Sequence, residues 1–189
     1  MREMIALLIV ATFGFGLLGC NEPPKTMADN EKAAVASCKA FAEAEEIYRR
    51  TDYEGAGVKQ YTPRLKGDLS LLETKAGKGD LNLIDRAFAN AEGNPSQHPT
   101  PKDGYCFKVL NGQGPNATGG KKSYLVNGKM TLGYALVAYP AVYNSTGRNT
   151  FTINSNGTIF QHDLGPETHR IVEEMTEFDE KWVVPADAM

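Results

Sequence analysis

The sequence predicts an α+β fold in which an N-terminal helix packs on an antiparallel β-meander, with a short second helix and a C-terminal helix. Asn127-Gly128 and Asn156-Gly157 each separate two strand-like runs, and both dipeptides suit tight hairpin turns. Between them lies Met130–Tyr139, a long apolar run that we expect to be the central strand. Residues 30–50 carry apolar side chains at helical spacing, which indicates the long helix.

Length and composition fit one globular domain preceded by an N-terminal segment. The chain has 189 residues, of which 41% are hydrophobic, so it can form a real core. Its net charge is −3, and it has no block of basic residues. Nucleic acid is therefore not an expected partner, because binding to phosphates requires clustered Lys and Arg. We expect residues 30–189 to form a single α+β domain.

Residues 1–19 have the features of an export signal. Ile5–Leu18 is an almost unbroken apolar run, too short to anchor stably across a bilayer. It ends in Leu17-Leu18-Gly19-Cys20, which resembles the lipobox of bacterial lipoproteins, where the signal peptide is cut before the cysteine and the thiol is acylated. The alternative is an ordinary signal peptide followed by a coincidental cysteine.

The lipobox resemblance implies an exported protein held in the cell envelope by palmitate-type acyl chains on Cys20. Each buried CH₂ contributes about 0.8 kcal/mol, so several chains anchor firmly. Residues 20–29 then comprise the lipidated cysteine and a short extended tether with two prolines. The membrane is the expected partner, with other envelope proteins as candidates, and the expected location is the outer membrane or the periplasmic face.

Cys38 and Cys106 remain once Cys20 is lipidated. Export would place them in an oxidising compartment, where an even pair of cysteines indicates a disulfide. A bridge closing so long a loop would stabilise the domain by about 4 kcal/mol. Two buried free thiols are the alternative, because spacing alone does not bring the two Cα atoms together.

The helices are predicted from capping residues and apolar spacing. Asp29 or Asn30 can cap a helix that runs to about Arg50. Its apolar stripe comprises Ala34, Cys38, Phe41, Ala44 or Glu45, and Tyr48. A second helix is expected between Asp80 and Gly93. A last helix is expected to start at Pro166. Its inner stripe is predicted to be Ile171, Met175 and Phe178.

The first strand is expected at Gly104–Leu110. In this strand Tyr105, Phe107 and Val109 alternate with Cys106, Lys108 and Leu110. The glycine-rich segment Asn111–Lys122 follows as a loop. It is not a phosphate-binding loop, because no Gly-Lys-Ser/Thr closes it and no helix pattern follows it.

The segment Gly104–Gly165 resembles the bacterial family called domain of unknown function 2950. The residues that carry the resemblance are Gly104-Tyr105, Gly112-Gln113-Gly114, Gly119-Gly120, Tyr124–Met130, Gly133–Pro140, Tyr143, Thr146-Gly147, Thr150-Phe151, Gly157 and Asp163-Leu164-Gly165. The resemblance implies an exported protein with a helix-plus-sheet domain. It transfers no catalytic residues, because the family's name states no activity.

The order of elements also resembles the head of type IV pilins, in which a long helix precedes an antiparallel meander. Pilins keep their apolar N-terminal helix and carry a glutamate early in it, whereas Met4–Gly16 contains no acidic residue and the apolar run ends in a lipobox. This likeness of fold implies a pilin-like head without pilin-type polymerisation, and does not fix the function.

No set of residues in the sequence identifies an enzyme, and we expect no catalytic residues, cofactor or metal. His162 and Asp163 precede the last helix and Glu167 and His169 lie in its first turn, but their spacing fits no known ligand motif. Motifs for a nucleophile are missing as well. Tyrosines gather in the sheet region, where they line a ligand groove or, as we favour, pack in the core. They are Tyr105, Tyr124, Tyr134, Tyr139 and Tyr143.

The sequence therefore favours a non-enzymatic envelope lipoprotein that acts as a structural or interaction module. The alternative is a periplasmic ligand-binding protein or hydrolase that uses the sheet aromatics or the corner formed by His162 and His169.

Overall fold

The computed structural model describes residues 25–55, 57–74 and 81–182. The helices in these residues are α1 (Met27–Thr51), α2 (Arg86–Asn90) and α3 (Thr168–Glu174), with 3₁₀ turns η1 (Pro95–Gln97) and η2 (Gly165–Glu167). The strands are β1 (Tyr105–Leu110), β2 (Gly112–Gln113), β3 (Lys122–Ser123), β4 (Leu125–Val126), β5 (Lys129–Met130), β6 (Ala135–Pro140), β7 (Thr150–Asn154), β8 (Ile159–His162) and β9 (Glu177–Phe178). This arrangement confirms the predicted α+β fold. No helix in the described ranges is long and apolar enough to cross a membrane.

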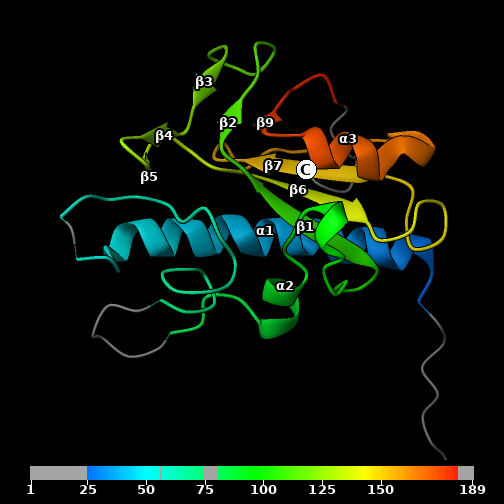
Figure 1. Ribbon diagram of the computed structural model, residues 1–189, viewed down its shortest axis with the longest axis horizontal. Helices are drawn as coiled ribbons and strands as arrows, with labels where there is room; N and C mark the ends of the chain where they lie inside the picture. Colours follow the sequence, from blue (N-terminus) through cyan, green and yellow to red (C-terminus); the bar gives the residue numbers. More distant parts are fainter. Residues whose placement is uncertain (1–24, 56, 75–80, 183–189) are drawn as a thin grey trace, which may run out of the picture.

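The main sheet has four antiparallel strands in the order β1-β6-β7-β8. The long helix α1 lies along one face of this sheet, and α3 lies on the other (Figure 1). β6 is the central strand, and all six of its residues are buried because it is covered on both faces. It begins at Ala135, five residues after the predicted start at Met130.

The first predicted hairpin forms, but outside the main sheet. Asn127 and Gly128 both have positive φ (51° and 77°) and join β4 to β5 in a separate two-stranded sheet. Gly133 then redirects the chain: a Cβ atom at this position would lie 2.9 Å from the Tyr124 ring. The second hairpin forms as predicted, with Gly157 in the turn between β7 and β8.

The long helix begins at Met27, earlier than predicted. Thr26 is the N-cap, and its hydroxyl and backbone N–H bond reciprocally with Asp29 in a capping box. The helix ends at Thr51, with Asp52 in the left-handed conformation. The helix therefore includes residues 27–29, which were predicted to form the end of the extended tether.

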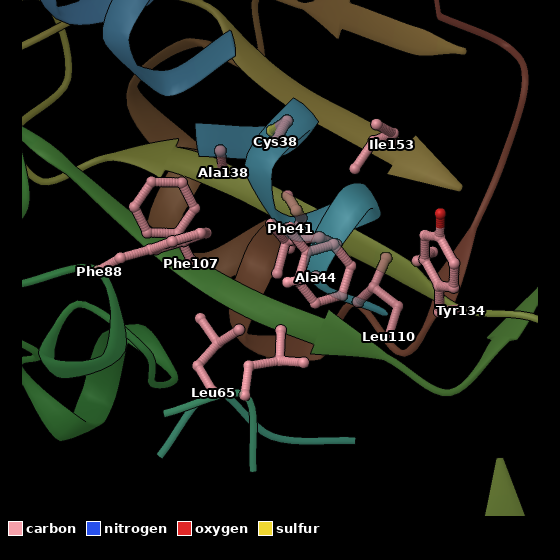
Figure 2. Close-up of a cluster of buried hydrophobic side chains, with 14 of the residues drawn as sticks. Cys38, Phe41, Ala44, Leu65, Phe88, Phe107, Leu110, Tyr134, Ala138 and Ile153 are labelled. Atoms are coloured by element: carbon pink, nitrogen blue, oxygen red, sulfur yellow. The ribbon is translucent and has the colours of Figure 1, made fainter. Parts of the chain in front are cut away.

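The core forms where the apolar stripe of α1 meets the sheet. Every residue of the predicted stripe is buried. Figure 2 shows Cys38, Phe41 and Ala44 pointing at side chains of the strands, with Phe88 of α2 beside the cluster. Phe88 packs edge-on against Phe107 of β1, with ring centroids 4.6 Å apart. The helix is thus fixed to three of the four strands by apolar packing.

The other two helices differ from the prediction in length and face. The second helix covers only Arg86–Asn90, with Asp85 as its N-cap. The last helix starts with a 3₁₀ turn at Gly165 and ends at Glu174. It buries Thr168 and Val172 instead of Ile171, and Phe178 belongs to strand β9.

Glu45 is the one charged-type residue of the α1 stripe, and it is completely buried. Its Oε2 atom accepts a hydrogen bond from the Thr62 backbone N–H (3.0 Å), while Oε1 has no partner among the described residues. Burial raises the pKa of this carboxyl well above its ordinary value of 4.5, despite the bond from Thr62 and with a further upward contribution from Glu46. The folded state therefore holds the Glu45 proton more tightly than the unfolded state does.

We predict that Glu45→Gln stabilises the domain increasingly as the pH rises. The stability linked to a raised carboxyl pKa is fully present below pH 4.5 and falls as the pH rises toward the folded-state value. Glutamine cannot ionise, so the variant should gain on the order of 1 kcal/mol over wild type at pH 8 and little at pH 4. Urea unfolding at both pH values measures this difference. The exposed Glu43→Gln serves as the control, and a gain of equal size at pH 4 and pH 8 would contradict the ionisation argument.

Candidate functional site

The predicted Cys38–Cys106 disulfide is wrong: both residues are free, buried thiols. Phe107 and Ala138 pair in register and lie beside Cys38 on the α1 face of the sheet (Figure 2). Cys106 pairs with Tyr139 one position along, so its side chain points to the opposite face. The sheet itself separates the two thiols, whereas a disulfide requires Cα atoms within about 7 Å.

The predicted lipidation site, Cys20, lies outside the described residues. The sheet tyrosines pack mainly in the core, which is the interpretation that the sequence favoured. Fully buried are Tyr105, Tyr124, Tyr134 and Tyr139. Tyr143 lies near the surface, and its hydroxyl donates to Asp163 (3.4 Å). The tyrosines therefore do not form an exposed aromatic stripe that would line an open groove.

The structure does not join His162 and His169 into one site. The His162 ring stacks on Trp182, with centroids 5.8 Å apart and an interplanar angle of 26°. The His169 ring packs edge-on against Tyr139 (5.7 Å), and its Nε2 atom lies 3.0 Å from the carbonyl oxygen of Pro140. In the described part of the chain, no three His, Cys, Asp or Glu side chains are grouped so that they could hold a metal ion.

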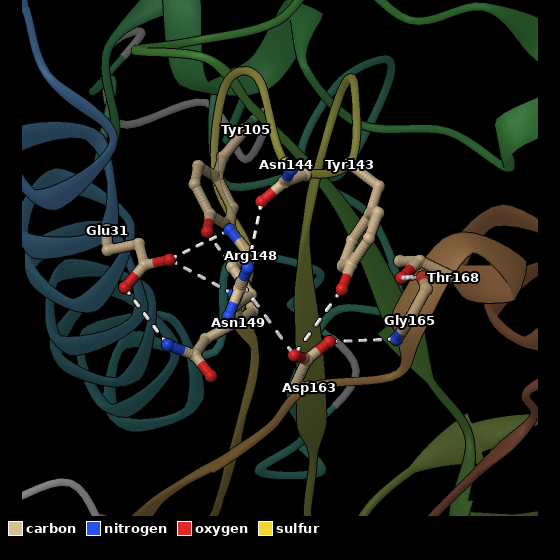
Figure 3. A network of polar contacts seen from close by, with 9 residues as sticks. All are labelled: Glu31, Tyr105, Tyr143, Asn144, Arg148, Asn149, Asp163, Gly165 and Thr168. Carbon is tan, nitrogen blue, oxygen red and sulfur yellow. Dashed lines mark hydrogen bonds and ion pairs between the residues drawn. The ribbon is translucent and has the colours of Figure 1, made fainter.

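Asp163 takes part in a network that positions the loop after β6 (Figure 3). One carboxylate oxygen accepts from the Gly165 backbone N–H (2.9 Å), and the other lies 3.9 Å from Nε of Arg148. Glu31 of α1 accepts from the backbone N–H groups of Arg148 and Asn149. Glu31 and Asp163 therefore hold the loop between β6 and β7 in place, whereas His162 stacks on Trp182.

Cys106, Tyr139 and His169 instead meet at a pocket of about 240 Å³ on the α3 face of the sheet. It lies between the sheet, α3 and the proline-rich segment around η1. The remaining lining residues are Pro95, His98, Pro99, Pro101, Ala141 and Val142. Three of these residues are prolines of the segment 94–103, and their rings supply a rigid apolar wall that no local sequence pattern marks as part of a pocket.

The walls of this pocket are tied together by hydrogen bonds. The Tyr139 hydroxyl donates to the carbonyl oxygen of Gly93 (2.9 Å), which fixes the start of the η1 segment to β6. Ser96 donates through both its N–H and its hydroxyl to Glu173 of α3 (2.9 and 2.7 Å). Lys108 of β1 donates to the carbonyl oxygens of Val172 and Glu173, which caps the C-terminal end of α3. The cavity is therefore preformed.

The protonation states of the pocket argue against nucleophilic catalysis by its thiol. Burial raises the pKa of the Cys106 thiol to about 11, so the reactive thiolate is scarce at neutral pH. Burial likewise raises the pKa of the Tyr139 phenol, with smaller contributions from Cys106 and Glu173. The geometry suits a small, neutral, mostly apolar ligand.

Comparison with known proteins assigns the family. A family model described as "Protein of unknown function (DUF2950)" matches residues 24–184. The chain belongs to the DUF2950 family. No curated protein and no solved structure matches it significantly. The family model covers both α1 and the pocket. The match therefore extends beyond Gly104–Gly165 to nearly the whole described part of this DUF2950 protein.

We predict that the two thiols of this DUF2950 protein resist alkylation in the native state. Burial raises the pKa of Cys38 to about 12, and Cys106 is buried as well. Iodoacetamide at pH 8 should leave both unmodified under native conditions, and should modify both in denaturant without any reductant. Intact mass and peptide mapping measure the outcome. A Cys38–Cys106 disulfide in the non-reduced protein would contradict the structure.

Proposed function

We propose that this DUF2950 protein is a lipid-anchored envelope protein that acts as a non-enzymatic structural or interaction module with a pilin-like head. The observation that carries the anchor is the sequence Leu17-Leu18-Gly19-Cys20 after an apolar run. The pilin-like part of the proposal takes its support from the order of the fold, in which the long helix α1 precedes and packs on an antiparallel sheet.

The length of α1 supports a module that holds one end of the domain away from the membrane. α1 has 25 residues, which at 1.5 Å per residue gives a length of about 37 Å. Its N-terminal end follows the tether, and its C-terminal end lies at the other end of the molecule, near the β4–β5 hairpin (Figure 1). That hairpin is fixed to the domain by a bond from Tyr61 N–H to the carbonyl oxygen of Met130 (2.8 Å). A domain anchored at its N-terminus would therefore present the hairpin away from the membrane.

The hairpin end carries exposed apolar side chains suited to a protein contact. Val126 is 41% exposed and Leu132 is 52% exposed, although both are large hydrophobic residues. Ile47, near the C-terminal end of α1, is 46% exposed. We propose that another envelope protein binds here.

In-cell photo-crosslinking from position 126 tests both parts of this proposal. We expect a discrete adduct with an envelope-assembly component, and we expect Cys20→Ala to remove both membrane fractionation and the adduct, because the anchor places the hairpin. Cys38→Ala is the control, as it removes a buried thiol but leaves the anchor. Unchanged membrane fractionation of Cys20→Ala would refute the anchor. Adducts with bulk envelope proteins alone would refute the interaction module.

A second candidate function is the binding of a small apolar ligand in the pocket formed by Cys106, Tyr139 and His169. The preformed cavity of about 240 Å³ is the observation that favours it. A hydrolase using this thiol is disfavoured, since burial holds its pKa near 11. A binding site for a neutral ligand needs no ionised group in the pocket.

We predict that indole, as a small aromatic probe, binds wild type and shifts the imidazole NMR signals of His98 and His169. Ala141→Leu should weaken this binding at least tenfold by filling the cavity. Ala40→Leu on the exposed face of α1 is the matched control and should bind like wild type. Equal binding by both variants, or no saturable shift in wild type, would remove this candidate.

A further inference from the structure

The N-terminal end of the described chain is fastened to one end surface of the domain. Lys25 forms an ion pair with Asp103, in the turn before β1. Asn30 of α1 donates to the carbonyl oxygen of Thr146 (2.9 Å), in the loop between β6 and β7. The chain therefore leaves the folded domain at Lys25, beside the 141–149 loop.

The distance from this point to the proposed anchor is limited by covalent geometry. Four residues lie between Cys20 and Lys25, so five Cα-to-Cα steps join them, and these span about 18 Å at most when fully extended. If Cys20 carries the lipid, the domain cannot swing far from the bilayer. The inference that follows rests on the proposed lipid anchor.

The end surface nearest this exit point carries apolar side chains. We define it by Met27, Val142, Tyr143 and Arg148. Val142 is 55% exposed and Met27 is 39% exposed, although both are large hydrophobic residues. Tyr143 lies next to Val142 in the loop and combines an apolar ring with a polar hydroxyl, as do residues that favour membrane–water boundaries.

Hydrogen bonds within the loop and packing on the core hold Val142 in place. The Thr146 hydroxyl accepts from the Val142 backbone N–H (3.0 Å), and Asn144 N–H donates to the carbonyl oxygen of Gly147 (2.8 Å). A side chain at Gly147 would lie 2.1 Å from the Tyr105 hydroxyl, so the loop packs directly on the core. Figure 3 shows that Glu31 accepts from the backbone N–H groups of Arg148 and Asn149 at the end of the loop, and that Asp163 contacts the side chains of Arg148 and Tyr143. The exposed valine is thus held outward at little further entropic cost.

The charges of the end surface largely offset one another. Arg148 lies 3.9 Å from Asp163, and Lys25, next to the surface, pairs with Asp103. Lys102 lies 3.1 Å from Asp103 and 3.8 Å from Asp85, so three basic residues face three acidic ones. A surface without excess positive charge gains little from anionic headgroups. Contact with a bilayer would therefore depend on its apolar and aromatic side chains.

We propose that the end surface docks on the lipid bilayer, with Val142 and Tyr143 in the headgroup region beside the acylated Cys20. The docked domain stands with α1 pointing away from the membrane. The bilayer thus holds the acyl chains of Cys20 and also contacts the folded domain directly.

The test uses the full-length acylated protein on phosphatidylcholine vesicles containing a spin-labelled phosphatidylcholine. An environment-sensitive dye is attached through Val142→Cys or, as a control of matched exposure at the other end, Leu132→Cys. The native Cys38 and Cys106 are buried, so they should not take the dye. We expect at least threefold stronger quenching of the dye at position 142 than at position 132, with little change when one third of the lipid is replaced by phosphatidylglycerol.

The outcomes separate this inference from the anchor on which it rests. Protein that carries acyl chains by mass and floats with the vesicles, but shows equal quenching at both positions, would overturn docking and leave the anchor intact. Quenching that appears only with phosphatidylglycerol would overturn the apolar mode of contact. Protein that neither carries lipid nor floats would overturn both proposals.

Discussion

The packing of α1 on the sheet is the interaction on which the rest of the structure depends. Small side chains at Ala44 and Ala138 allow close approach of helix and strands, while the rings of Phe41 and Phe107 fill the space between them (Figure 2). All six residues of β6 are buried, so the face of this apolar strand that is opposite α1 is covered as well. The short helix α3 and strand β9 supply that cover, although they are far apart from α1 in the sequence.

The same packing accommodates a charged-type residue at a cost. Glu45 lies on the helix face that meets the core, so it is buried with only one of its oxygens hydrogen bonded. The bond from the Thr62 N–H fixes the 61–72 segment to α1. This contact partly offsets the cost of burying a carboxyl. Tyr61 continues this tie, since its hydroxyl donates to Glu46 (3.0 Å) and its backbone holds the β4–β5 hairpin.

Local signals predicted the elements well, and the failures have particular causes. The helix stripe and the two Asn-Gly turns are encoded within a few residues, and all form. The disulfide prediction was wrong because an even number of cysteines in an exported chain does not show which face of a sheet each cysteine occupies. The alternation of side chains along the first strand did indicate that Cys106 and Phe107 point to opposite faces. The first hairpin was assigned to the wrong sheet because the contact that turns the chain, Gly133 against the Tyr124 ring, is not marked by any local pattern.

The candidate site was harder to predict, because it is assembled from segments that local patterns treat separately. Cys106 and His169 come together because η1 and α3 lie on the same face of the sheet. Val142 lines this pocket and also belongs to the end surface beside the tether. If that surface rests on the bilayer, Val142 brings one wall of the pocket close to the headgroups. The proposed ligand site and the proposed membrane contact would then lie side by side, because both include this residue.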